Sequence, residues 1–333
     1  MIKNKNILAL CTTAFFNDRG CHTRILKILK YMENGNNRID LVCYSYGRNI
    51  EGYRIYRVGK LFKYFDPVGF HFLKIIFDVQ IFFKAFRMLR EKDYDYILSF
   101  THEAGILALI LKFVYKKEYI LDYQGSLYSE LSTSNFIFKI PPFSFFIILI
   151  ERLVEKYSYA IIYNTNFNFS KSRKNRRYFV DDEIIFYEKD KEQHYNCSSP
   201  KRIVWVGVNT KVQNLSTFLK IAENIVEKKD ALFYIITFPL NKKIKERFKR
   251  YKDKIIFIEK VPYEELPAYL KKADICVSTK LDSTEGSGKL HLYKKYCKNV
   301  LSLDSKISRE ILDEKQIVRN LEDMEKKILE IME

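Results

Sequence analysis

The residues best suited to chemistry follow a strand-like run that ends at Ser278, in the order Ser283-Thr284-Glu285-Gly286-Ser287-Gly288-Lys289-Leu290. Glycines between a strand and a helix let a ligand approach the backbone, and the first turn of the helix offers free N–H groups to an anion. Lys289 would add a positive charge at that turn, and Glu285 could accept hydrogen bonds from sugar hydroxyls. The spacing indicates an anion-binding turn, although a plain loop can carry the same glycines.

A second glycine-containing turn follows the first strand-like run, in the segment Asn17-Asp18-Arg19-Gly20-Cys21-His22-Thr23-Arg24. Open α/β sheets bind ligands at the carboxyl ends of their strands, where this turn is expected to lie. Arg19 and Gly20 are therefore candidates for contact with a ligand, and Arg24 is expected on the first helical turn. The structural alternative is that the arginines only cap a surface loop.

Two further strand-like runs end in polar side chains that are expected at the same edge of the sheet. His102 follows one run, and the segment Asp122-Tyr123-Gln124-Gly125-Ser126 follows the next. We expect His102 to take part in the site, and Asp122, Gln124, Gly125 and Ser126 to lie on the side of a second substrate. A lone histidine is often structural, and Ser126 is equally suited to be the N-cap of the next helix.

Metal binding is not indicated. The pair Asp93-Tyr94-Asp95 has the spacing of a metal-binding D-x-D, but it lies before a strand, at the end far from the predicted site. Carboxylates in such a place ordinarily solvate a turn, and no other histidine or carboxylate cluster suggests a metal. We therefore expect no metal site and no bound cofactor.

Short apolar runs alternate with longer helical patterns, which predicts α/β domains with parallel sheets buried on both faces. The expected strands are 7–12, 39–43, 96–99, 119–122, 160–163, 202–206, 232–237, 255–258, 275–278 and 300–303, and the expected helices are 22–32, 70–91, 104–114, 143–157, 215–228, 244–251 and 263–271. The pattern runs twice and breaks at the polar segment 188–200. We expect two Rossmann-like domains facing across a cleft, residues 1–190 and 200–305, and a helical tail, 306–333.

Several segments of the second half together resemble the donor domain of GT-B glycosyltransferases of family 4. They are Val204-Trp205-Val206-Gly207, Val212-Gln213-Asn214-Leu215, Pro262-Tyr263-Glu264-Glu265-Leu266-Pro267 and the run EGSGKLHLY that starts at Glu285. The last run is similar to a subgroup with the loop E-G-N-G-K-L-L-x-Y, whose Asn is replaced here by Ser287. The resemblance implies that Gly207, Gln213, Gly286, Ser287, Gly288, Lys289 and Leu290 contact the donor.

Two departures from the family pattern concern the donor. Family 4 usually has a second acidic residue eight positions after the first, and this position is Tyr293 here. The family also commonly places an Arg and a Lys after the glycine of the first strand of this domain, where this chain has Val208 and Gln213. Lys289 is then the best remaining cation in this domain for a diphosphate, and the missing acid leaves the nucleotide unassigned.

The first half resembles the same family at the R-G-x-x-x-R turn from Arg19 to Arg24, at His102, and at the run DYQGSL that starts at Asp122. The resemblance implies that a sugar is moved from a nucleotide-sugar co-substrate to a glycan or lipid-linked acceptor, with retention of configuration and without a metal. Lys289, Arg19 and the helix after Gly288 would stabilise the leaving diphosphate, while Glu285 and His102 orient the sugar. Surface polysaccharide or glycoconjugate biosynthesis is the expected setting.

Two rival functions stay open at this point. A nucleotide-sugar epimerase on the same architecture would need no acceptor. A degenerate GT-B protein that only binds or scaffolds other enzymes would account for the departures at Val208, Gln213 and Tyr293.

The composition points to an anionic partner. The 333 residues include 58 Lys and Arg against 41 Asp and Glu, a net charge of +17, with 15% aromatic residues. Residues 54–92 combine basic and aromatic side chains, and 171–177 reads KSRKNRR. We favour peripheral attachment to an anionic membrane surface, and the alternative is a core helix with solvated charges. No nucleic-acid partner is expected, because no binding motif accompanies the charge.

The cysteines and the apolar runs bear on localisation. Six cysteines show neither a C-x-x-C pair nor zinc spacing, which favours a reducing cytoplasm. The longest apolar stretch, 136–150, is interrupted by Lys139 and Pro141-Pro142 and is too short to span a bilayer. We expect a cytoplasmic protein without a transmembrane segment, peripheral on the inner face of the membrane.

Overall fold

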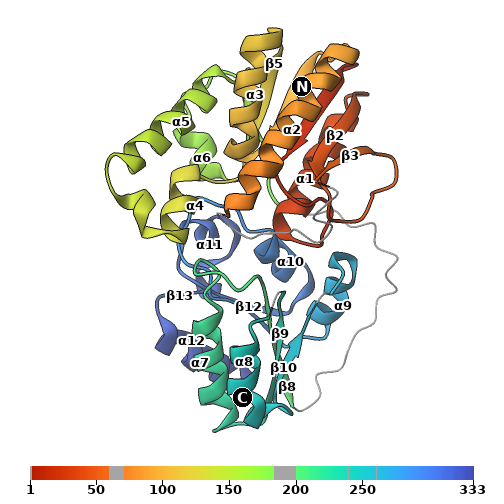
Figure 1. Ribbon diagram of the computed structural model, residues 1–333. Helices are drawn as coiled ribbons and strands as arrows, with labels where there is room; N and C mark the ends of the chain where they lie inside the picture. The colour runs from red at the N-terminus through yellow and green to blue at the C-terminus, as the bar shows by residue number, and fades with distance from the viewer. Residues whose placement is uncertain (1, 60–70, 184–199, 239, 260) are drawn as a thin grey trace. The chain divides into compact units, whose positions relative to one another are not determined.

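The computed structural model describes residues 2–59, 71–183, 200–238, 240–259 and 261–333 (Figure 1). The chain forms two compact units. The first contains Met1–Asp182 together with Thr284–Gly286, and the second contains Glu183–Ser283 and Ser287–Glu333.

The first unit is built on a seven-stranded sheet in the order β3-β2-β1-β4-β5-β6-β7, with every neighbouring pair parallel. Its strands are β1 Asn6–Cys11, β2 Arg38–Tyr44, β3 Arg54–Val58, β4 Tyr96–Phe100, β5 Glu118–Tyr123, β6 Ala160–Tyr163 and β7 Arg177–Phe179. The central strand β1 is apolar and buried from Ile7 to Cys11, because helices cover both faces of the sheet. The five strands predicted in this half are confirmed, whereas the edge strands β3 and β7 were not predicted.

Helices separate these strands and make two hydrophobic cores. They are α1 Gly20–Glu33, α2 Phe72–Glu91, α3 Thr101–Tyr115, α4 Leu127–Ser134, η1 Phe136–Lys139, α5 Phe143–Tyr157 and α6 Asn166–Lys171. The buried side of α1 packs on one face of the sheet through Ile25, Ile28 and Leu29. The buried residues of α2 and α3, with Val154 of α5, pack on the other face.

The second unit is built on a six-stranded sheet in the order β10-β9-β8-β11-β12-β13, again parallel throughout. Its strands are β8 Lys201–Val206, β9 Ala231–Ile236, β10 Ile255–Ile258, β11 Ile275–Ser278, β12 Asn299–Leu303 and β13 Ile317–Val318. The helices are α7 Leu215–Val226, α8 Lys242–Arg247, η2 Lys249–Tyr251, η3 Tyr263–Glu265, α9 Leu266–Lys271, α10 Gly288–Tyr296, α11 Lys306–Ile311, η4 Glu314–Gln316 and α12 Leu321–Met332. One core joins the sheet to α7 and α12, and the other joins it to α9, α10 and α11.

Besides the missed edge strands, three predicted elements differ from the structure. The helix predicted at 244–251 is α8 followed by η2, and the helix predicted at 263–271 begins as the 3-10 turn η3. The expected tail, 306–333, is not wholly helical, because Ile317–Val318 pairs with β12 as the edge strand β13. Residues 188–199 of the expected linker lie outside the described residues. The same holds for Phe70, the first residue of the helix predicted at 70–91.

In the described part of the chain, we find no helix with both the length and the apolar character needed to cross a membrane.

Candidate functional site

The turn between β11 and α10 holds the strongest candidate residues of the second unit. Helix α10 begins at Gly288 after the N-cap residue Ser287, within one residue of the predicted start. The Ser287 side chain makes no capping hydrogen bond to the helix, so the helix itself does not use that hydroxyl to satisfy its first N–H groups. The Leu290 side chain is fully buried in the core beneath α10, where it anchors the helix, so its predicted contact with the donor would have to come from its backbone.

Lys289 lies on the first turn of α10, and the partners of its ammonium group among the described residues are neutral. Nζ donates to Oε1 of Gln213 over 2.6 Å and to the carbonyl of Val206 over 3.4 Å, and it lies 5.1 Å from the centroid of the Trp205 ring. Burial and the nearby charge of Lys280 lower its pKa to about 7. Among the described residues no carboxylate pairs with Lys289, so an anionic ligand would be its natural counter-ion.

Lys280 is a second cation of this region, which we did not predict. Only 2% of the residue is exposed, although it follows β11 by two residues. Its charge is near enough to oppose the protonation of Lys289. A lysine that continues the apolar run of β11, in the order Ser278-Thr279-Lys280, is the signal that could have identified it.

The loop between β8 and α7 is held in place by Trp205 and Thr279. Trp205 Nε1 donates to Thr279 Oγ1 over 3.1 Å, and that hydroxyl lies 3.1 Å from the carbonyl of Gln213. A Cβ on Gly207 would lie 2.8 Å from the Trp205 ring, so glycine is required there by packing. Gln213, which we predicted to contact the donor, accepts a hydrogen bond from Lys289 through its side-chain oxygen.

Tyr293 takes a structural role at the position where family 4 usually has its second acid. The residue is fully buried on α10, and its hydroxyl oxygen accepts a hydrogen bond of 2.7 Å from the backbone N–H of Val206 at the end of β8. Burial raises the pKa of the phenol. The tyrosine therefore fastens α10 to the sheet as a neutral group.

Two buried hydroxyls lie at the carboxyl ends of strands in the same unit. Ser278 ends β11, and Thr237 directly follows β9. Neither side-chain oxygen has a hydrogen-bond partner among the described residues. Buried polar groups are usually paired, so these two hydroxyls are exceptions that lie at the carboxyl edge of the sheet.

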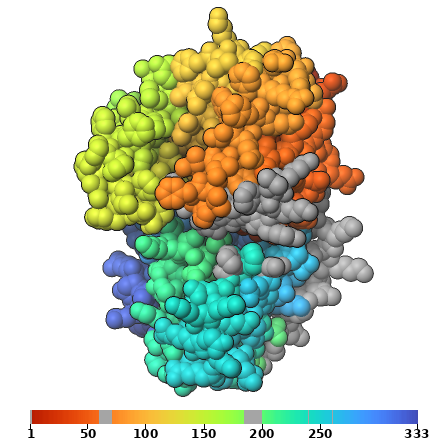
Figure 2. All heavy atoms as spheres, viewed as in Figure 1, coloured from red at the N-terminus to blue at the C-terminus, as the bar shows by residue number. Residues whose placement is uncertain are grey.

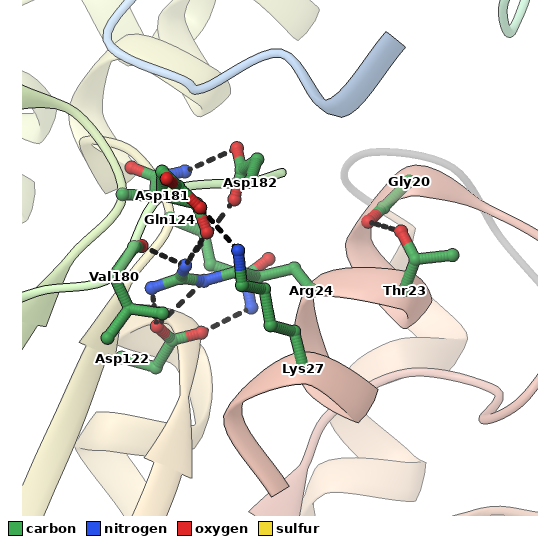
Figure 3. Close-up of polar contacts among 10 residues, drawn as sticks. Gly20, Thr23, Arg24, Lys27, Asp122, Gln124, Val180, Asp181 and Asp182 are labelled. Carbon is green, nitrogen blue, oxygen red and sulfur yellow. Dashed lines mark hydrogen bonds and ion pairs between the residues drawn. The ribbon is translucent and has the colours of Figure 1, made fainter. Parts of the chain in front are cut away.

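In the first unit, Arg24 is the centre of an internal ion-pair network (Figure 3). It is 3% exposed, and its Nε and Nη2 atoms lie 3.1 and 2.7 Å from Oδ1 of Asp122, which is fully buried. Nη1 donates to the carbonyls of Val180 and Asp181, and Gln124 donates to the other carboxylate oxygen of Asp122 over 2.8 Å. Asp122 and Gln124, predicted on the acceptor side, thus hold α1 against the end of β5.

The turn after β1 is organised by His22, which sequence analysis did not single out. His22 is fully buried, Nδ1 accepts from the backbone N–H of Asn17 over 2.8 Å, and Nε2 lies 3.2 Å from Thr13 Oγ1. Burial and the charge of Arg19 lower its pKa, so the ring is neutral. Arg19 is the N-cap residue of α1, and Gly20 is exposed with open space where a Cβ would lie.

Ser126 is the N-cap of α4, which confirms the structural alternative for this residue. Its hydroxyl accepts from the N–H of Ser129 over 3.2 Å and donates to Glu151 over 2.9 Å. In the same unit, the Ser126 N–H donates to Thr284 Oγ1 over 2.9 Å. A Cβ on Gly125 would lie 2.9 Å from Cγ of Glu285, so the structure brings these two predicted residues together.

His102 lies on the first turn of α3 and is 2% exposed. Its Nε2 lies 3.3 Å from Oε1 of Glu155, and its ring packs edge-on against Tyr123. His102, Glu151 and Glu155 bring three potential metal-binding atoms within 4.8 Å of one another, a group that we did not predict from the sequence. Glu151 also accepts the hydrogen bonds that fix the start of α4, so the group has a structural use.

The D-x-D pair lies before β4 and is engaged by lysines. Asp93 pairs with Lys117 over 2.7 Å, and Asp95 pairs with Lys5 over 3.1 Å. Asp95 also accepts from the backbone N–H of Asn6, at the start of β1. These carboxylates fasten the amino ends of two strands.

The comparisons with known proteins agree with this architecture. Residues 200–333 match the family model described as "Glycosyl transferases group 1". No curated protein matches the sequence. The fold is that of the GT-B glycosyltransferases, with two parallel-sheet Rossmann-like domains of seven and six strands.

Three solved structures illustrate the likeness. Sucrose-phosphate synthase from Thermosynechococcus elongatus is 11% identical with a TM-score of 0.72, and the match covers 99% of this chain and 90% of that one. WaaG, a glycosyltransferase involved in lipopolysaccharide biosynthesis, is 12% identical with a TM-score of 0.71, covering 98% and 90%. HepE from Anabaena, in complex with UDP-glucose, is 12% identical with a TM-score of 0.66, covering 99% and 90%.

Proposed function

We propose that this protein is a glycosyltransferase that moves a sugar from a nucleotide-sugar donor to a glycan or lipid-linked acceptor. The observation that carries the proposal is Lys289, a partly buried cation with neutral partners on the first turn of a helix. The residues that match the group 1 family model include this turn. A helix N-terminus with an adjacent ammonium group is suited to a diphosphate.

In this reaction, Lys289 and the start of α10 would stabilise the leaving diphosphate. As the bond between the anomeric carbon and the donor oxygen breaks, negative charge grows on the nucleoside diphosphate. Preorganised positive charge lowers the barrier because it needs no reorganisation at that moment. Lys289 and the N–H groups after Gly288 would supply it, with Lys280 adding long-range potential.

The resemblance to family 4 supports retention of configuration and transfer without a metal, and the likeness to WaaG supports an acceptor in surface glycoconjugate synthesis. HepE binds UDP-glucose, which makes UDP-glucose a rational first donor to test. Glu285 and His102 are proposed to orient the sugar, and Arg19 with Gly20 to lie beside the phosphates.

The test compares Lys289→Ala with Lys295→Ala, which removes an exposed lysine from the same helix. Nucleotide sugars are first screened for thermal stabilisation of the wild-type protein, and the best donor is used with radiolabelled sugar and membrane or glycan acceptors. Lys289→Ala is expected to lower transfer by at least about 100-fold, as for loss of one oxyanion-stabilising group. Lys295→Ala is expected to leave transfer unchanged.

If Lys289→Ala transferred sugar as fast as the wild type, the proposed role of this lysine would be wrong. Release of an isomerised nucleotide sugar from donor alone would indicate an epimerase. Absence of stabilisation by every nucleotide tested would favour a non-catalytic binding protein.

A further inference from the structure

Large apolar side chains are exposed in four neighbouring elements of the first unit. In the described part of the chain, all exposed large hydrophobic residues except Phe179, Leu281 and Leu321 lie in α2, α3, η1 and α5 or, in the case of Ile140, in the link between η1 and α5. They are Phe72, Ile75, Ile76, Val79, Phe83, Ile110, Phe113, Val114, Phe136, Ile137, Ile140, Phe143, Phe145, Phe146, Leu149 and Tyr157. We call these residues the apolar face, since soluble monomers rarely expose so many together.

The apolar face spans elements that lie side by side. Helix α3 contacts both α2 and α5, and η1 contacts α5. In Figure 2, the orange atoms of α2 and the yellow-green atoms of η1 and α5 occupy the visible side of this unit. The three helices cover the same face of the sheet, with their buried stripes in one core.

Helix α2 carries two apolar stripes instead of one. Phe77, Ile81 and Ala85 are fully buried against the sheet, as the core requires. A second stripe at helical spacing faces outward. It includes Phe72, which is 76% exposed, and Phe83, which is 63% exposed. The core does not account for the second stripe, because a helix on a sheet needs only one apolar side.

The connection from η1 into α5 is the most aromatic part of the apolar face. Phe145 and Phe146 are exposed by 68% and 61%, and Phe136 by 72%. The next turns of α5 bury only Ile147 and Val154. Aromatic side chains on a short helical segment beside a basic margin are typical of surfaces that enter the interfacial region of a bilayer.

Exposed basic residues border the apolar face. In α2 the exposed stripe continues into Arg87 and Arg90, and in α5 it continues into Arg152 and Lys156. Lys139 and Lys116 add charge at the ends of η1 and α3. Exposed acid within these four elements is confined to Glu91, whose charge is paired with Arg87 over 2.6 Å.

We propose that the apolar face is a docking surface for an anionic lipid bilayer, with the phenylalanines among the acyl chains and the arginines and lysines at the headgroups. The charge favours a bilayer over a second copy of the chain, because a self-complementary contact would bring two basic margins together. The sequence pointed to residues 54–92 for this attachment, and the structure adds η1 and α5 from a distant segment. The proposal concerns lipid binding and does not depend on sugar transfer.

The test is flotation of the full-length protein with vesicles of phosphatidylcholine containing 30% phosphatidylglycerol, and with vesicles of phosphatidylcholine alone, in the absence of any donor. The double variant Phe145→Ser/Phe146→Ser is compared with Leu321→Ser, an exposed apolar residue of the second unit. We expect the wild type and Leu321→Ser to float with the anionic vesicles. The double variant should bind at least about tenfold more weakly, because two apolar side chains no longer enter the interface.

Two further measurements test whether the double variant is correctly folded. Thermal unfolding and gel filtration of the double variant should match the wild type, which shows that lost binding is not lost folding. Failure of the wild type to float with anionic vesicles at low salt would overturn the proposal, as would equal flotation of the double variant. A wild-type dimer that the double variant dissociates, without vesicle binding, would assign the apolar face to self-association.

Discussion

The two units use buried positive charge differently. In the first unit, the cations beneath the carboxyl edge of the sheet pair with carboxylates: Arg24 with Asp122, Lys27 with Asp181 and Lys74 with Glu103. In the second unit, Lys289 has an amide oxygen, a backbone carbonyl and an indole ring as its neighbours. In the first unit, each of these cations is balanced by a carboxylate of the protein. In the second unit, no described carboxylate balances the charge of Lys289, and a bound anion would do so.

This difference separates structural cations from candidates for ligand binding better than sequence position does. Arg24 and Lys289 both stand near the start of a helix that follows a strand and a loop, so motif spacing gives them equal weight. A paired, buried cation contributes chiefly to folding, because its removal leaves an uncompensated partner. A cation without an acid costs stability in the empty protein and regains it on binding.

The largest expected effect is a loss of stability on breaking the Arg24–Asp122 ion pair of the first unit. Asp122→Ala leaves the Arg24 guanidinium buried with Asp182 as its remaining carboxylate, at 3.5 Å. We expect the free energy of unfolding to fall by about 3–5 kcal/mol. Urea titration followed by circular dichroism measures it.

The control for Asp122→Ala is Asp304→Ala, which breaks the surface pair with Arg309, a side chain that is 69% exposed. Such a pair is worth less than about 1 kcal/mol. Equal losses in the two variants would show that the Arg24 network is not the anchor described here.

A second effect concerns the pH dependence of donor binding. Because burial and Lys280 lower the pKa of Lys289 to about 7, the empty protein loses this proton above neutral pH, whereas a bound diphosphate favours the protonated form. The affinity should therefore be flat below pH 7 and fall by up to about tenfold per pH unit above it. Calorimetry with UDP-glucose, or the donor found by screening, from pH 6.5 to 9 measures the slope.

Lys289→Arg is the matched variant for the pH experiment, since a guanidinium stays charged throughout this range. Its affinity is expected to lose the slope above pH 7. A wild-type affinity that does not change between pH 7 and 9 would contradict the lowered pKa of Lys289.

The fold was predictable to the extent that strands are buried on both faces. All ten predicted strands exist because apolar runs such as 7–11 have no polar face to expose. The strands that were missed, β3, β7 and β13, lie at sheet edges, where one side of the backbone is unpaired and the residues are partly exposed. Local composition carries little signal for these three strands, whereas the edge strand β10 is a wholly apolar run and was predicted.

The site was predictable as a set of turns but not as a set of contacts. The turn before Lys289 follows from glycine spacing, whereas its contact with Gln213 depends on how two loops meet across the sheet. The grouping of His102 with Glu155 likewise joins residues 53 positions apart through the packing of α3 on α5. Leu290 was assigned to the ligand by motif alone, and only burial shows that it faces the core.

The smallest effect concerns Tyr293, which stands at the position where family 4 usually has its second acid. Tyr293→Phe keeps the packing of the ring but leaves the Val206 N–H at the end of β8 without its acceptor. We expect a loss of about 1–2 kcal/mol in the free energy of unfolding and no direct loss of donor binding, because the phenol holds α10 rather than a ligand. Tyr234→Phe, at a partly buried tyrosine of the same unit, is the control for removing a hydroxyl. If Tyr293→Phe kept full stability but lost donor affinity, the tyrosine would belong with Lys289 among the ligand-binding groups.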